Sequence, residues 1–214
     1  MMIIQVFPSG PFKTNAYVIA CSDTKKTAII DPAPQSTLTI IPFIEKQGLH
    51  VQKILLTHSH WDHIADAADM KATYQVPVLV HPKDAKNLEE PGSDGIPLFI
   101  SIEPVEPGGF FGEGDIISVG NLKLEALETP GHTPGGVCFY IKEHGALISG
   151  DTLFCGTMGR LSIPTGEPDA MWKSLIKLSH LPAITKVYPG HGDPTTIGAE
   201  HWLQDAQKRF GNSD

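Results

Sequence analysis

Four side chains of the kinds that bind metals, His58, His60, Asp62 and His63, stand within six positions in the stretch THSHWDH. They directly follow the apolar run KILL, which predicts a short buried strand. Because side chains alternate between the faces of a strand, two histidines two positions apart at its end point the same way and can reach one cation. Asp62 and His63 follow where the chain turns into a helix and face an adjacent position. One loop can therefore serve two metals.

Three further candidate ligands each stand at the end of a later apolar strand and beside glycine. They are His132 in TPGHTPGG, Asp151 in ISGDTLF and His191 in VYPGHG. Glycine lets the backbone turn sharply and brings the neighbouring side chain close to a metal. Two metals with open positions for water need roughly seven protein ligands, which is the number that both sets supply together. Taken singly, each of the three is an ordinary turn residue, so their order after HxHxDH carries the prediction.

Composition excludes several other classes of protein. The 24 acidic and 16 basic residues give a net charge of −8, and no run of Lys and Arg occurs, which argues against a nucleic-acid partner. The three cysteines are widely spaced with no CxxC pair, so we expect no disulfide framework, a reducing compartment and a cytoplasmic location. No apolar window approaches 18 residues, and the N-terminus lacks the features of a signal peptide, so no membrane association is expected.

Strand and helix patterns occur in two successive sets. The first set predicts strands at 2–7, 16–21, 26–31, 53–57 and 76–81, with helices at 36–47 and 67–75. The second predicts strands at 116–119, 121–128, 136–141, 146–149 and 186–189, with helices at 169–180 and 196–210. Each half runs from strands into helices, so we expect an α+β chain in one domain, 1–214, with two sheets packed face to face and helices outside.

The remaining features with chemical potential have simpler interpretations. Residues 91–114, rich in Pro and Gly and with an exposed aromatic look at Phe110 and Phe111, are interpreted as a surface loop, with a substrate-covering lid as the alternative. Cys155 is interpreted as a buried apolar thiol, with a position near the site, close to Asp151, as the alternative. The other histidines lack a ligand context and are interpreted as surface or packing residues: His50, His81, His144, His180 and His201.

The ordered ligands resemble the signature of the metallo-β-lactamase superfamily, HxHxDH followed by His, Asp and His. The resemblance spans residues 58–191 and implies an αββα four-layer sandwich of two mixed sheets, with the metal site at one edge. It also implies a role for each residue: His58, His60 and His132 on one metal, Asp62, His63 and His191 on the other, and Asp151 bridging both.

Two divalent ions, zinc or else iron or manganese, lower the pKa of a shared water towards about 7, so that a bridging hydroxide is the expected nucleophile. One ion polarises a carbonyl, while Asp62 and Asp151 orient the ions and the water. Such a site suits an activated carbonyl or a phosphodiester. The acidic chain argues against nuclease relatives, and the penicillin-type hydrolases commonly have Cys where Asp151 stands.

The segment 150–182, which begins GDTLFCGTMGR, is similar to the hydroxyacylglutathione hydrolases, or glyoxalase II enzymes. In that family a basic residue after glycine contacts a glutathione carboxylate, and Arg160 occupies this place; a surface arginine is the alternative. A thiolate leaves without a separate general acid, and no candidate for one is evident. GHGDP places Asp193 where the long enzymes have an aromatic residue, and only 23 residues follow His191, so the chain resembles the short members.

The leading hypothesis is a binuclear metal hydrolase that cleaves a small-molecule thioester, S-lactoylglutathione or a related hydroxyacyl thioester. The alternatives are a mononuclear iron persulfide dioxygenase, a lactonase and a non-catalytic metal-binding protein. The metal identity, the acyl group, glutathione as the thiol and the oligomeric state stay open at this point.

Overall fold

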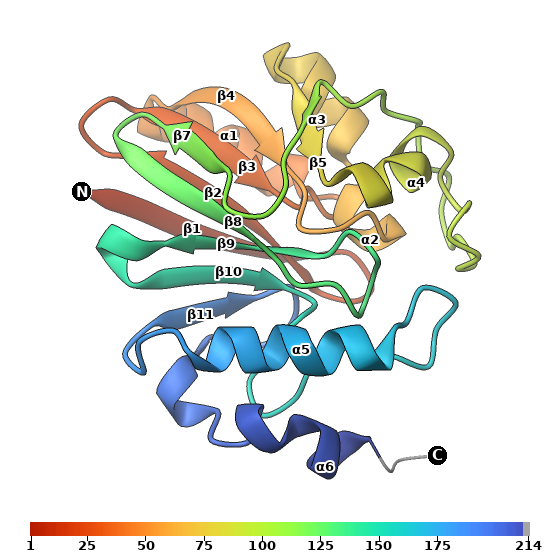
Figure 1. Cartoon of the computed structure of the whole chain (residues 1–214). Coiled ribbons are helices and arrows are strands. Elements are labelled where there is room, and N and C mark those ends of the chain that lie inside the picture. Colours follow the sequence, from red (N-terminus) through yellow and green to blue (C-terminus); the bar gives the residue numbers. More distant parts are fainter. Residues whose placement is uncertain (212–214) are drawn as a thin grey trace.

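Two six-stranded sheets pack face to face between layers of helices in the computed structural model, which describes residues 1–211 (Figure 1). The first sheet contains, in spatial order, β1 (Met2–Ser9), β2 (Thr14–Cys21), β3 (Lys26–Ile30), β4 (His50–Leu55), β5 (Val78–Val80) and β6 (Gly109–Phe110). The second contains β12 (Thr195–Thr196), β11 (Lys186–Pro189), β10 (Ala146–Gly150), β9 (Val137–Ile141), β8 (Leu122–Glu128) and β7 (Ile116–Val119). Both sheets are mixed, because β3 to β6 are parallel in one and β10 and β11 in the other. The predicted α+β sandwich is confirmed.

Helices cover both outer faces. On the first sheet lie α1 (Thr37–Gln47), α3 (Ala67–Tyr74) and α4 (Ala85–Glu89), and on the second α5 (Pro168–Ser179) and α6 (Ala206–Phe210). Helix α1 buries Ile40 and Ile44, one turn apart, and is capped by Gly48 in the left-handed conformation. The short α2 (Trp61–Ile64) sits at the edge of the sandwich. Single 3₁₀ turns occur at Pro82–Asp84, Lys142–His144, Ile197–Ala199 and Leu203–Asp205.

Three apolar layers hold the sandwich together. Ile29 and Ile54 pack with the helices over the first sheet, whereas Ile30 and Leu55, the next residues along β3 and β4, pack between the sheets. This alternation explains why these strands are apolar on both faces. Leu147 of β10 belongs to the third layer, beneath α5 and α6. Burial of each such side chain stabilises the fold by about 1.5–3 kcal/mol.

The strand directions bring five strand ends to one edge. Strands β8, β10 and β11 run the same way, because β9 is antiparallel to both β8 and β10 and β11 is parallel to β10. In the first sheet β3 and β4 are parallel. Polar residues that follow these ends can therefore converge where the two sheets meet.

The C-terminal segment departs from the predicted helix at 196–210. Thr195 and Thr196 instead pair with β11, two 3₁₀ turns follow, and α6 begins only at Ala206. Gly198 fits tightly here, since a Cβ would lie 2.9 Å from the carbonyl oxygen of Ala183. Contact with the second sheet thus overrides helix propensity.

The segment 91–114 is irregular apart from the short β6, as predicted for a loop, but it is not uniformly exposed. Ile102 and Val105 are buried in the first apolar layer, and Phe111 is only 3% exposed, which contradicts its predicted exposure. Phe99 is exposed and lies beside Phe12 and Trp61. The role of segment 91–114 as a substrate-covering lid stays a prediction.

All three cysteines are free thiols, and Cys21 and Cys138 are buried. Cys155 is exposed, so its assignment as a buried thiol is wrong; it stands in the turn after β10, outside the apolar layers. Within residues 1–211, none of the helices has the length and apolar character that a membrane crossing requires.

Candidate metal centre

The structure brings the seven predicted ligand residues together at the shared edge of the two sheets. Each follows a strand end: His58 and His60 after β4, Asp62 and His63 in α2, His132 after β8, Asp151 after β10 and His191 after β11. Six of them are at most 9% exposed, and His191 lies at the opening with 26% of its side chain exposed. The cluster is thus largely buried and most exposed at His191.

The first ligand group contains His58, His60 and His132. One nitrogen of each imidazole lies within 4.8 Å of one nitrogen of the other two, close enough to share a cation. The ring centroids are 4.5–5.1 Å apart, and the rings stand nearly perpendicular to one another. Three imidazoles arranged in this way can provide three corners of a tetrahedral metal site and leave one open.

The second ligand group contains Asp62, His63 and His191. The Nε2 atoms of the two histidines are 3.4 Å apart. Asp62 Oδ2 lies 3.4 Å from His191 Nε2 and 3.6 Å from His63 Nε2. It also accepts a 2.6 Å hydrogen bond from Thr14 Oγ1, which fixes the carboxylate. These atoms can share a second cation.

Asp151 lies between the two groups. Its Oδ2 atom is 3.3 Å from His132 Nε2, in the first group, and 3.4 Å from His191 Nε2, in the second. Its Oδ1 atom is 3.3 Å from His63 Nε2. The carboxylate therefore has the geometry of a bridge between two cations.

Hydrogen bonds give the imidazoles of His132, His63 and His191 the same orientation relative to the cluster. Their Nδ1 atoms face, in that order, the Arg160 carbonyl at 2.9 Å, the Asp31 carboxylate at 2.9 Å and the Phe12 carbonyl at 3.2 Å. These oxygens only accept hydrogen bonds, so each Nδ1 donates and each Nε2 faces the cluster.

His58 follows the same rule through Thr57. Thr57 Oγ1 donates its one hydrogen to Asp31 at 2.6 Å, so at 3.1 Å it accepts from His58 Nδ1. His58 Nε2 then faces the cluster, as it does in the other three histidines.

Sequence reasoning missed Asp31, a buried carboxylate with positive φ (51°) directly after β3. It lies within metal-binding distance of His58 and His63. However, Asp31 already accepts hydrogen bonds from the Thr57 N–H and hydroxyl and from His63 Nδ1, so it orients ligands. The signal is present, since Asp31 follows an apolar run as the ligands do, but the pattern includes Asp31 in the predicted strand 26–31.

A second missed carboxylate, Asp84, ties two ligand loops together. It accepts hydrogen bonds from the Ser59 N–H at 3.1 Å, between His58 and His60, and from the Gly135 N–H at 2.7 Å, beyond His132. Burial raises the pKa of this carboxyl. No pattern in the sequence indicated this role.

Histidines of the two ligand groups differ in the direction of their pKa shifts. Burial lowers the pKa of His60 to about 3 and that of His58 well below its usual range. In the second group burial acts the same way, but the carboxylates of Asp151 and Asp62 outweigh it and raise the pKa of His191 to about 9. Burial opposes ionisation of Asp62 as well, yet His63 and His191 hold its pKa at about 2. His58 and His60 are thus held neutral by burial, whereas His191 is held charged by the carboxylates beside it.

Two buried atoms fit a metal. Within residues 1–211, His58 Nε2 and Asp151 Oδ1 are fully buried and have no hydrogen-bond partner, which is costly unless a cation occupies the space. Imidazole and carboxylate donors suit zinc, iron and manganese. The residues present therefore fit divalent metal ions.

Two glycines next to ligands are required by packing. A Cβ on Gly190 would overlap Asp151 Oδ1 and lie 2.9 Å from His63 Cε1. Gly150 has a positive φ (48°), and a Cβ there would lie 2.5 Å from Thr57 Oγ1. The expected reason for glycine beside the ligands, a close approach, is confirmed at these positions.

Arg160 lies at the rim of the first group. Its backbone carbonyl faces His132, while its exposed side chain donates from Nε to Ser162 Oγ at 2.9 Å. Of the histidines predicted to be non-ligands, His81 is buried and lies 2.9 Å from Glu128 Oε1. The other four are exposed: His50, His144, His180 and His201.

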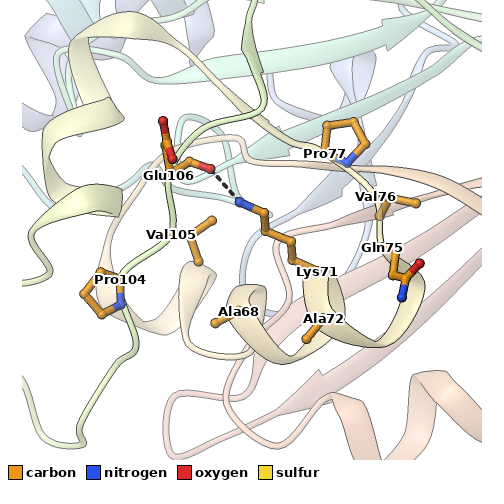
Figure 2. Close-up of a pocket in the computed structure, with 9 residues that line it drawn as sticks. All are labelled: Ala68, Lys71, Ala72, Gln75, Val76, Pro77, Pro104, Val105 and Glu106. Carbon is orange, nitrogen blue, oxygen red and sulfur yellow. Dashed lines mark hydrogen bonds between the residues drawn. The ribbon is translucent and has the colours of Figure 1, made fainter.

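Two cavities differ in their relation to the cluster. One of about 580 Å³ lies between α3 and residues 104–106, where Lys71 donates to the Glu106 carbonyl, and none of the seven residues lines it (Figure 2). A smaller cavity, about 160 Å³, is lined by His60 and includes Lys83, Lys86 and Thr165. Only the smaller one borders the metal centre.

Comparisons with known proteins agree with this geometry. Hydroxyacylglutathione hydrolase GloC of Haemophilus influenzae is 34% identical over 206 residues, covering 93% of this chain and 95% of that protein. The crystal structure of BLEG-1 B3 metallo-beta-lactamase superposes with a TM-score of 0.86 at 32% identity, covering 94% of this chain and 99% of that one. TTHA1623, solved in a di-iron-bound form, has a TM-score of 0.75 at 34% identity, covering 92% and 96%. Residues 9–191 match the metallo-beta-lactamase superfamily, and the chain belongs to this superfamily of metal-dependent hydrolases.

Proposed function

We propose that the chain is a binuclear hydrolase of thioesters that acts on S-lactoylglutathione or a related hydroxyacyl thioester. The observation that carries the binuclear part is the position of Asp151, whose one carboxylate lies 3.3–3.4 Å from histidines of both ligand groups. The substrate class is supported by similarity to the Haemophilus hydroxyacylglutathione hydrolase and by Arg160 at the rim.

In this proposal His58, His60 and His132 hold one ion, Asp62, His63 and His191 hold the other, and Asp151 contacts both. Two divalent ions in this place supply Lewis-acid polarisation of a carbonyl and a water of lowered pKa. Asp31, Thr57 and Thr14 fix the directions of the ligands, so that little rearrangement accompanies the reaction.

The ionisable groups around the site favour a good leaving group. Asp84 accepts hydrogen bonds from two backbone N–H groups, and Asp62 and Asp151 face histidines, so these carboxyl oxygens are engaged within the protein. A thiolate leaves without a general acid, whereas an amine does not. A thioester therefore matches the site better than an amide.

The cationic rim favours a substrate that carries a carboxylate. The backbone of Arg160 contacts His132 and its guanidinium group is exposed, while the cavity beside His60 is lined by Lys83 and Lys86. A guanidinium can hold a carboxylate through two hydrogen bonds and so place the thioester carbonyl at the metal centre. We propose zinc as the native metal, with iron or manganese as alternatives, and a cytoplasmic location, which suits three free thiols.

The test is hydrolysis of S-lactoylglutathione by protein whose metals have been counted by mass spectrometry. Turnover with two metals per chain is the expected result, and His60→Ala, which removes one ligand, should lose both metal and activity while keeping its secondary structure. Turnover by a metal-verified His60→Ala sample at the wild-type rate contradicts the assignment.

The same assay separates the alternatives. Two metals without turnover redirect the search to another thioester or an acyl lactone. One iron per chain with oxygen uptake on a glutathione persulfide indicates a dioxygenase. A chromogenic β-lactam belongs in the panel because of the similarity to BLEG-1, and its hydrolysis in preference to the thioester contradicts the proposed substrate class.

A further inference from the structure

Residues 159–165, which include Arg160, lie directly against the ligand loops. A Cβ on Gly159 would overlap the Asp151 carbonyl and lie 3.0 Å from His132 Nδ1. Just beyond, the Glu167 N–H donates to the Gly131 carbonyl at 2.7 Å. The segment is thus held in place beside the first ligand group.

Thr165 contacts two members of that group with one oxygen. Its Oγ1 donates to the His132 carbonyl at 2.8 Å and lies 3.0 Å from His60 Nε2. A hydroxyl has one hydrogen, and the carbonyl can only accept, so this hydrogen is committed to His132. Towards His60 the hydroxyl oxygen therefore accepts, and His60 Nε2 carries the proton.

We infer that Thr165 is a positioning residue that fixes the tautomer of His60, so that Nδ1 is the nitrogen His60 presents to a metal. The other four cluster histidines use their Nδ1 atoms for hydrogen bonds and turn Nε2 inward. His60 is the exception, and Thr165 is the group that makes it so. The inference depends on the metal centre and not on the identity of the substrate.

The same hydroxyl joins the two ligands mechanically. Because Thr165 binds the His132 backbone and the His60 ring together, a shift of one ligand is transmitted to the other. The backbone carbonyl of Arg160 adds a third contact by accepting a hydrogen bond from His132 Nδ1. Residues 159–165 thereby orient two of the three ligands of the first group.

Thr165→Val tests this role, because valine keeps the shape and removes the hydroxyl. His60 is 5% exposed, and in this variant its Nε2–H loses the hydroxyl that accepts its hydrogen bond. We expect the affinity for zinc, measured by competition with a chromophoric chelator, to fall by about 10–100-fold, as is usual when the hydrogen-bond partner of a metal ligand is lost.

A second readout needs neither metal nor activity. Long-range ¹H–¹⁵N correlation spectra of the metal-free full chain report which nitrogen of each histidine carries the proton. Wild type should show His60 protonated at Nε2, and Thr165→Val should populate the Nδ1-protonated tautomer. Thr165→Ser, which restores the hydroxyl, should recover both the tautomer and the zinc affinity.

Thr73→Val, an exposed threonine on α3, is the matched control and should change neither measurement. A wild-type tautomer in Thr165→Val, an unchanged zinc affinity, or a serine variant as weak as valine each overturns the inference. Failure of wild type to cleave S-lactoylglutathione contradicts the proposed substrate instead and leaves both readouts intact.

Discussion

The two ligand groups of the metal centre are held from different parts of the molecule. Two of the three ligands of the first, His60 and His132, are oriented by a loop of the C-terminal half, through the Thr165 hydroxyl and the Arg160 carbonyl. The second is oriented by the first sheet, through Asp31 after β3 and Phe12 in the turn between β1 and β2. The two groups have similar ligands but are oriented by different residues. A substitution in the residues that orient one group should therefore have a limited effect on the other group.

Asp151→Ala should have the largest effect, because this carboxylate is the group that the two halves share. We expect loss of both ions and a fall in activity on the order of a thousandfold or more. Metal content is measured after desalting, with Asp193→Ala, an exposed aspartate near His191, as the control. Retention of one ion at full affinity would show that Asp151 serves only one group.

Asp31→Asn should weaken mainly the second group. Asparagine tolerates the positive φ at this position, but its amide places N–H groups where the carboxylate accepts from Thr57 and His63. We expect the affinity for the second ion to fall by about 10–100-fold. Stepwise titration with zinc measures this, and a smaller effect on the first ion is expected through Thr57 and His58. Equal loss of both ions would contradict the idea of separate supports.

Arg160→Ala should distinguish the role of the Arg160 side chain from that of its backbone carbonyl. The carbonyl that orients His132 stays, so metal affinity and kcat should be unchanged. The guanidinium is lost, so KM for a thioester that carries a carboxylate should rise about tenfold, the usual effect of losing one charge-assisted hydrogen bond. Arg160→Lys should lie between the two. An unchanged KM removes this side chain from the substrate pocket.

Glu128→Gln should have the smallest effect and should leave both groups filled. A hydrogen bond with His81 is the main cause that lowers the pKa of Glu128, which precedes the His132 loop. A lowered carboxyl pKa stabilises the fold above the unfolded value, about 4.3, and this contribution is lost as pH falls through the folded pKa. The urea midpoints of wild type and variant should therefore differ at neutral pH and converge as the pH falls through the folded pKa of Glu128, which lies below the unfolded value. A difference between the two midpoints that grows as the pH falls would contradict this prediction.

The sequence alone could predict the sandwich and the gathering of the seven residues, because both follow from local patterns. Strands with alternating apolar faces, glycine stops and ligand residues at strand ends are visible one segment at a time. Their assignment as metal ligands stays a prediction. What the sequence could not show is what depends on contacts distant in the chain, such as Asp84 joining Ser59 to Gly135, or Thr165 joining His60 to His132.

Two of the errors, at the C-terminal helix and at Phe111, have the same cause. The C-terminal residues have helical periodicity, yet Thr195 and Thr196 extend because β11 offers an open edge. Phe111 looked exposed within a loop rich in Pro and Gly, yet it packs against Phe139 in the apolar layer between the sheets. In each case a tertiary contact decided against the local pattern.

The ligands come from both sheets, from a stretch of chain that runs from His58 to His191. Ions bound there would link the two halves of the chain in the native state and have no comparable site in the unfolded chain. At an ion concentration a hundred times the Kd, such binding adds about 2.7 kcal/mol to the free energy of unfolding. Metal supply would then set how long a molecule survives proteolysis, in addition to whether it is active.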